Sequence, residues 1–420
     1  AGIHFFKGEI QQSLELNKRA YEIAKDIDNK ALIAAILNNI ADKYYHMKEY
    51  DKAIDYVKEA LKVNPSFAVG LGTLIDIYIS KGDIKEAKVY LDQLGEHSEK
   101  SEWIKTIYYK SKASILKSSL RARDRIKAED ILKELAMDNT LLGETRIQAI
   151  IDLCDLYLTE LRITNDTEII NEIHPYIQEL LSIAEKRHLH LFLAETYILQ
   201  AKLSLLTLEL NKAKRFLTRA QGIADSYGIK RLAMKISNEH DELLRKTKMW
   251  ENLKISEVSV SERLELTGLN EQMENMVKRR LVEVPEISKE DPVILLILTE
   301  GGNLLFSKKF AEDFSFEDDI LGGFLTTVNY IINEVFSEGL DRAVFGQYTL
   351  LMMPLQPFLI CYVFKGASYY AYNKIKNFLD SIHNDNVIWH SLQKFFQKSK
   401  SIQIDDIPSL ESLITEIFAK

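Results

Sequence analysis

Apolar and small residues recur at helical spacing through the first 253 residues of the chain. In the stretch from Tyr44 to Pro65, Ala53 and Ala60 lie seven positions apart, on one face of a helix. Pro65 follows directly and blocks continuation of that helix. The pattern therefore predicts pairs of antiparallel helices that pack through small residues.

The same arrangement returns along the chain. Ala87 follows Ala53 by one period of about 34 residues, after the turn Lys81-Gly82-Asp83. This spacing of small, aromatic and proline positions resembles the tetratricopeptide repeat (TPR), an all-α solenoid of helix pairs. Further helices are expected at Lys7–Asp26, Ile104–Leu120, Ile126–Leu135, Gly143–Leu161 and Asp166–Lys186, and Ala194–Tyr227 is expected to be the last repeat unit. Pro175 should kink or divide the helix that contains it, and Ile229–Leu253 should form one polar-faced capping helix.

Strand patterns begin only after Pro292. Five short runs of β-branched and aromatic residues, bounded by glycine or proline turns, predict a five-stranded antiparallel sheet. These runs are Val293–Thr299, Leu304–Phe310, Arg342–Phe345, Tyr348–Met352 and Phe358–Lys365. Helices are expected at Ser315–Ser337, Tyr369–Ile382, Trp389–Gln397 and Ser409–Ala419.

The order strand, strand, helix, three strands, helix resembles the longin and roadblock domains of the profilin-like group. The motif Glu300–Ser307, the run Asp319–Leu325 and the segment Tyr362–Gly366 look like archaeal multidomain members of that group. The resemblance implies docking to a small GTPase or to a second copy of the domain. It also allows Arg263–Arg280 to be the extra N-terminal helix of the roadblock type.

The chain is therefore expected to have four parts. Residues 1–253 form the TPR-like solenoid with its capping helix, and residues 254–291 form a linker and a helix. Residues 292–398 form the α/β domain, and residues 399–420 form a C-terminal linker and short helix. The start AGIHFF, without Met, suggests a fragment of a longer chain.

Composition narrows the class of function. The net charge of −8 argues against a nucleic-acid partner, which favours a basic surface. The apolar runs are too short for a membrane span. Cys154 and Cys361 cannot build a disulfide framework, which suits a reducing, cytoplasmic location. His188 and His190, with Glu185 nearby, fall short of the four ligands that a structural zinc site needs. No phosphate-binding loop or catalytic motif is found, so we expect no catalytic, cofactor or metal site.

Two sets of residues are candidates for partner contacts. In the solenoid, Asn38, Asp42, Tyr45 and Asp76 fall on positions that line the TPR groove. TPR domains that grip acidic chaperone tails place Asn and Lys there, so Asp42 and Asp76 should repel such a tail. The alternative is that these four side chains are simply solvated.

In the α/β domain, Leu321 and Leu325 extend the apolar surface of the Ser315–Ser337 helix beyond the stripe expected to pack on the sheet, and Thr326 flanks them. They are expected in a protein contact, with a small GTPase or in a homodimer; the alternative is that the sheet or the Arg263–Arg280 helix covers them.

The sequence thus favours a non-catalytic scaffold with protein partners at both ends. A competing hypothesis is a sensory module whose sheet pocket binds a small ligand; an enzyme is the least favoured class.

Overall fold

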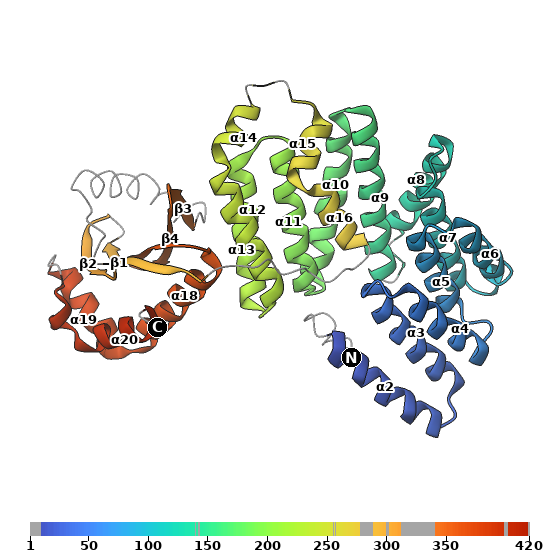
Figure 1. Cartoon of the computed structure of the whole chain (residues 1–420), viewed down its shortest axis with the longest axis horizontal. Coiled ribbons are helices and arrows are strands. Elements are labelled where there is room, and N and C mark those ends of the chain that lie inside the picture. Colours follow the sequence, from blue (N-terminus) through green and yellow to red (C-terminus); the bar gives the residue numbers. More distant parts are fainter. Residues whose placement is uncertain are drawn as a thin grey trace. The chain divides into compact units, whose positions relative to one another are not determined.

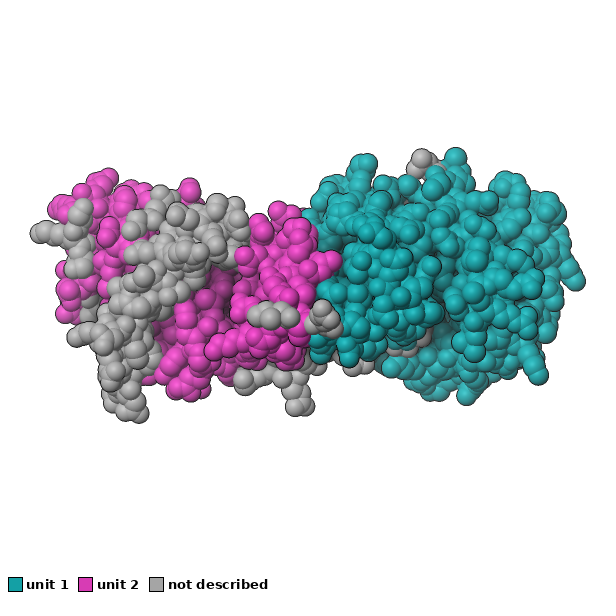
Figure 2. Space-filling view, turned by 90° about the horizontal axis from the view of Figure 1, so that it is seen from above, with its two compact units in different colours: residues 1–206, 258–282 teal, residues 207–257, 283–420 magenta. Residues whose placement is uncertain are grey.

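The computed structural model describes residues 10–138, 140–141, 143–254, 256, 258–277, 289–299, 302–311, 341–398 and 402–418. Two compact units are present (Figure 2). Unit 1 holds residues 1–206 and 258–282, and unit 2 holds residues 207–257 and 283–420. Each unit is therefore built from two separate stretches of chain.

Unit 1 is all-helical among its described residues. Its helices are α2 (Ile10–Asp26), α3 (Lys30–His46), α4 (Tyr50–Val63), α5 (Ala68–Lys81), α6 (Ile84–Gly95), α7 (Glu102–Lys117), α8 (Ala122–Met137), α9 (Gly143–Thr164), α10 (Glu168–Lys186), α11 (His190–Leu206), α15 (Val260–Thr267) and α16 (Leu269–Val277), with a short 3₁₀ turn at Ser98–Lys100. The predicted helical repeat is confirmed. Pro175 does not divide α10, which runs through it.

The packing positions predicted from the sequence are buried. Ala53, Val57 and Ala60 have no exposed surface and line the contact of α4 with α3 and α5. In each of two successive units, a stacked pair of tyrosines joins the first helix to the second. The ring centroids are 5.3 Å apart in Tyr44–Tyr56 and 5.5 Å apart in Tyr78–Tyr90. These pairs recur one period apart, so the repeat is preserved in its aromatic packing.

The first helices of successive pairs form a continuous layer. α3 contacts α5, α5 contacts α7, and α7 contacts α9 (Figure 1). Each second helix instead packs between its own partner and the next first helix, as α4 does between α3 and α5. Elements lie closest together on the inner side of a curved stack, so this layer is the inner face of the repeats.

The segment Arg263–Arg280 does not form the single extra helix of an α/β domain. Residues 260–277 instead make α15 and α16, which break at Gly268, where φ is +60°. Both helices pack against α9 and α11 of unit 1. Their apolar side chains join the core built by α8 to α11.

Unit 2 contains the predicted sheet, and the antiparallel five-stranded fold is confirmed. Its strands are β1 (Asp291–Thr299), β2 (Leu304–Lys309), β3 (Arg342–Phe345), β4 (Tyr348–Leu355) and β5 (Phe358–Lys365), in the order β2-β1-β5-β4-β3. α18 (Ser368–Asn384), α19 (Asn386–Gln397) and α20 (Pro408–Phe418) complete a core on one face, where Tyr362, Phe378 and Phe418 meet. The ring centroids of Tyr362 and Phe418 are 4.8 Å apart.

Three helices N-terminal to the sheet also belong to unit 2. They are α12 (Leu210–Ser226), α13 (Lys230–Arg245) and α14 (Thr247–Leu253). Ile229–Leu253 is thus two helices rather than one, and α13 packs on β3 and α18 instead of presenting a polar outer surface. The division between the units consequently differs from the expected boundary at residue 253.

Buried polar contacts explain why α13 stays with the sheet. Arg342 of β3 has a fully buried side chain, and its Nη1 donates to Asp241 and Ser237 of α13 at 3.3 Å each. Asp241 also accepts hydrogen bonds from the backbone N–H of Ser368, at 2.9 Å, and from its hydroxyl. A buried guanidinium needs such partners, so these contacts join α13 to β3.

Candidate functional site

The predicted groove residues lie on the inner layer of unit 1. Asn38, Asp42 and Tyr45 belong to α3, and Asp76 belongs to the adjacent α5. Tyr45 joins the two helices, because its hydroxyl lies 2.9 Å from Ser80 Oγ of α5. Asn38 is buried, and its Oδ1 has no hydrogen-bond partner among the described residues. The structure therefore brings these candidates to one face, while their role in binding stays a prediction.

Asp42 is held by two basic neighbours on its own helix. Lys43 Nζ donates to Asp42 Oδ2 at 2.9 Å, and His46 Nε2 lies 3.2 Å from Asp42 Oδ1. Burial alone would raise the pKa of Asp42, but the His46 contact and the charge of Lys43 outweigh it and hold the pKa below its usual range. The carboxylate stays ionised and is already paired with the ammonium group of Lys43.

Asp76 has a partner that the sequence pattern did not single out. Lys110 Nζ of α7 lies 3.6 Å from Asp76 Oδ2. Asp42, Asp76 and Lys110 occupy equivalent positions in three successive units, one period of about 34 residues apart. Because Asp42 and Asp76 both face cations, they repel an acidic tail less than two free carboxylates would. Continuing the period into α7 would have located Lys110 from the sequence.

The row of polar contacts continues from α7 to α9. Lys117 Nζ lies 3.0 Å from Asp155 Oδ2 and also donates to Asp152. Although burial opposes a charge on Lys117, the two carboxylates raise its pKa above the usual value. The ammonium group is thus fixed in its charged form, which suits a structural ion pair rather than proton transfer.

Comparison with known proteins supports the repeat assignment. Two models of the tetratricopeptide repeat match the chain, one over residues 1–66 and one over residues 44–105. The N-terminal region carries tetratricopeptide repeats. The chain is also similar to "Uncharacterized protein ycf37" of Pyropia yezoensis, with 29% identity over 91 residues, which is 22% of this chain. The chain spans about half the length of that relative, whose printed name assigns no activity.

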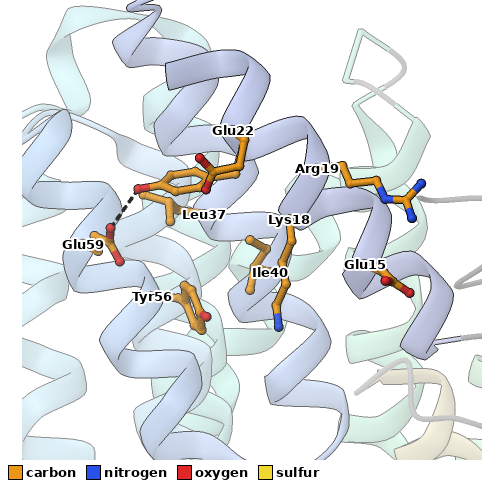
Figure 3. A pocket seen from close by; sticks show the side chains of 9 residues that line it. Glu15, Lys18, Arg19, Glu22, Leu37, Ile40, Tyr56 and Glu59 are labelled. Carbon is orange, nitrogen blue, oxygen red and sulfur yellow. Dashed lines mark hydrogen bonds between the residues drawn. The ribbon is translucent and has the colours of Figure 1, made fainter. Parts of the chain in front are cut away.

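The tetratricopeptide repeats also form a pocket that sequence reasoning missed. It has a volume of about 530 Å³ and lies among α2, α3 and α4 (Figure 3). Leu37 and Ile40 lie at its apolar side, and charged residues of both signs surround it: Glu15, Lys18, Arg19, Glu22 and Glu59. Tyr21 donates to Glu59 Oε1 at 3.1 Å; burial and this contact raise the pKa of Tyr21. These mixed charges select no single kind of ion.

The second set of candidates cannot be placed. Leu321, Leu325 and Thr326 lie in residues 312–340, outside the described residues, and so does the expected Ser315–Ser337 helix. Their assignment to a docking surface stays a prediction.

Two cysteines and a histidine pair are further candidate reactive groups in the described ranges. Cys154 and Cys361 are buried, which raises the pKa of both thiols and keeps them protonated and unreactive. The rings of His188 and His190 are 6.1 Å apart, and the described residues hold no group of three or more His, Cys, Asp or Glu that could bind a metal. Among the described helices, none has the length and apolar character needed to cross a bilayer.

Proposed function

We propose that this protein is a non-catalytic scaffold whose inner repeat face binds one protein partner while its α/β domain docks a second. Tetratricopeptide repeats are a protein-interaction module, and the continuous inner layer of α3, α5 and α7 is the observation that carries the proposal. Its polar groups are positioned by contacts between neighbouring helices, so little order is lost when a partner binds.

An exposed aromatic residue supports this surface. Trp103 of α7 occupies the position equivalent to Ala35 and Val69 in the two preceding units and is 49% exposed. Tryptophan is enriched among residues that dominate binding energy at protein interfaces. Together with Tyr45 and the Asp76–Lys110 pair, it offers a partner both an apolar anchor and polar contacts.

A charge reversal with a matched control tests the inner face. Asp76→Lys would place two cations beside each other on α5 and α7, whereas Asp55→Lys makes the same change at an exposed position of the outer helix α4. Proteins that become cross-linked to the wild-type full chain should no longer be cross-linked to the Asp76→Lys variant. They should still be cross-linked to the Asp55→Lys variant. Identical sets of cross-linked proteins for both variants would contradict binding at the inner face.

For the α/β domain, we propose docking of a small GTPase or a second copy through Leu321, Leu325 and Thr326. What supports this is the order of elements around a five-stranded antiparallel sheet and its likeness to longin and roadblock domains. A folded Leu325→Asp variant should no longer bind the GTPase or self-associate. Intact association in that variant would remove these residues from the interface.

A further inference from the structure

Residues 258–277 return to unit 1 after the chain has passed through α12 to α14 of unit 2. The segment carries α15 and α16 and packs against α9 and α11 (Figure 1). α9 contacts α7 and so continues the inner layer of first helices, which places the segment against that layer. Its five buried apolar side chains are those of Val260, Leu264, Leu269, Met273 and Met276.

Polar side chains of the repeats make hydrogen bonds at three helix ends: the start of α15, the end of α15 and the end of α16. At the start of α15, Asn165 Oδ1 accepts a hydrogen bond from the backbone N–H of Ser261 at 3.0 Å. At its end, Lys202 Nζ of α11 donates to the carbonyl of Thr267 at 3.1 Å. Helix ends carry backbone groups without partners inside the helix, so each contact recognises a helix terminus.

The end of α16 is recognised in the same way. Gln148 of α9 donates through Nε2 to the carbonyl of Val277 at 3.3 Å. In the opposite direction, Arg263 of α15 donates through Nη1 to the carbonyl of Leu206 at the end of α11, at 2.9 Å. Apolar burial along the helices, combined with polar contacts at their ends, is how a helical peptide ligand is held in a groove.

The helices themselves are dependent on this surface. α15 has 8 residues and α16 has 9, and isolated helices of that length are unstable in water. Gly268 between them adopts φ of +60°, which favours glycine, and a Cβ there would lie 3.4 Å from Lys202 Nζ. The segment therefore takes its helix–glycine–helix form on the repeats, as a ligand that folds on binding does.

We propose that residues 258–277 are a built-in ligand of a helix-binding surface on α9 and α11. The partner class for this surface is an amphipathic helix–glycine–helix segment with leucine or methionine on one face. A partner protein reaches the surface only by replacing the segment, so binding there is restrained by the chain itself. This inference deepens the proposed function, because it names a second ligand class for the same repeats and its regulation.

The test uses the full chain and a fluorescent peptide of residues 258–277 as probe. Leu264→Asp places a charge at a fully buried position of α15, whereas Leu266→Asp makes the same change two residues away, where the side chain is 50% exposed. The peptide should bind Leu264→Asp at least ten-fold more tightly than it binds the wild-type chain or Leu266→Asp, as measured by fluorescence anisotropy.

Hydrogen exchange of the wild-type chain gives an independent reading. Amides of α15 and α16 should exchange at least ten-fold faster than those in the middle of α9. The reason is that a bound segment can detach while the helices that bind it stay folded. Equal exchange rates, equal peptide affinity in the three proteins, or loss of α9 protection in Leu264→Asp would overturn the proposal, since each places the segment in the permanent core. Such a failure leaves the α3–α7 site untouched, because the Asp76→Lys comparison tests that site separately.

Discussion

Asp241 is the residue on which the attachment of α13 to the sheet depends most. Its carboxylate accepts hydrogen bonds from Arg342 Nη1 at 3.3 Å, from the Ser368 backbone N–H at 2.9 Å and from the Ser368 hydroxyl. All three residues are buried. Replacing Asp241 with alanine removes the acceptor for each donor at once, so we expect a large loss of stability in unit 2.

The contacts that remain set the size of that loss. The two Ser368 donors would be buried without partners, at about 1–3 kcal/mol each. Arg342 would keep Asp341, whose Oδ1 lies 3.1 Å from Nε, so the full cost of about 3–5 kcal/mol for an unpaired buried charge does not apply. The sum is about 2–6 kcal/mol. Asp241→Asn keeps an acceptor and the side-chain shape but loses the charge, and should cost roughly half as much.

Urea unfolding followed by circular dichroism measures the free energy, and hydrogen exchange locates the change. The faster exchange should appear in α13, β3 and the first turn of α18, including the Ser368 amide. A loss of unfolding free energy below about 1 kcal/mol for Asp241→Ala would refute the reasoning, because two buried donors without acceptors should cost more than that. Equal losses for alanine and asparagine would show that charge alone matters.

Two further predictions test other parts of the packing. Ala53→Leu should destabilise unit 1 by about 1–3 kcal/mol in thermal or urea unfolding, because Ala53 is fully buried between helices; an unchanged midpoint would place it outside that contact. Burial and the charge of Arg342 lower the pKa of His240 to about 3, whereas the unfolded value is about 6.5. The unfolded chain therefore binds a proton that the folded chain does not bind between pH 6 and pH 4. Unit 2 should lose about 1.4 kcal/mol of stability per pH unit as the pH falls through this range. His240→Gln should lose less over this range, and an equal pH dependence in both proteins would contradict a neutral buried imidazole.

Local patterns were sufficient to predict most elements of both units. The 34-residue recurrence of alanine and tyrosine located the helix pairs from α3 to α6, because each repeat buries the same positions against its neighbours. The five strands were equally readable, since they are short runs rich in apolar residues, most of them with glycine or proline beside them. Such signals can be read along the chain and do not need the tertiary structure.

The grouping of the elements could not be predicted, because it depends on contacts across long stretches of sequence. Nothing in the helical pattern of α13 distinguishes Asp241 from an exposed carboxylate until Arg342, about a hundred residues later, is placed beside it. For the same reason Gln148 and Val277 gave no signal of their hydrogen bond. In the candidate site, the period located Asp42 and Asp76, but their pairing with lysines depends on side-chain geometry.

The path of the chain explains why composition gave a misleading boundary. The Ser-rich stretch near residue 256 looks like a linker between a helical half and a strand-bearing half. In the structure it is where the chain leaves unit 2 for α15 and α16, and a second crossing follows before β1. A linker in the sequence therefore marks a crossing and not a division, because the buried Arg342 pairs with Asp241, which precedes the linker. Where a fold is discontinuous, the partners of buried charges identify its units better than composition does.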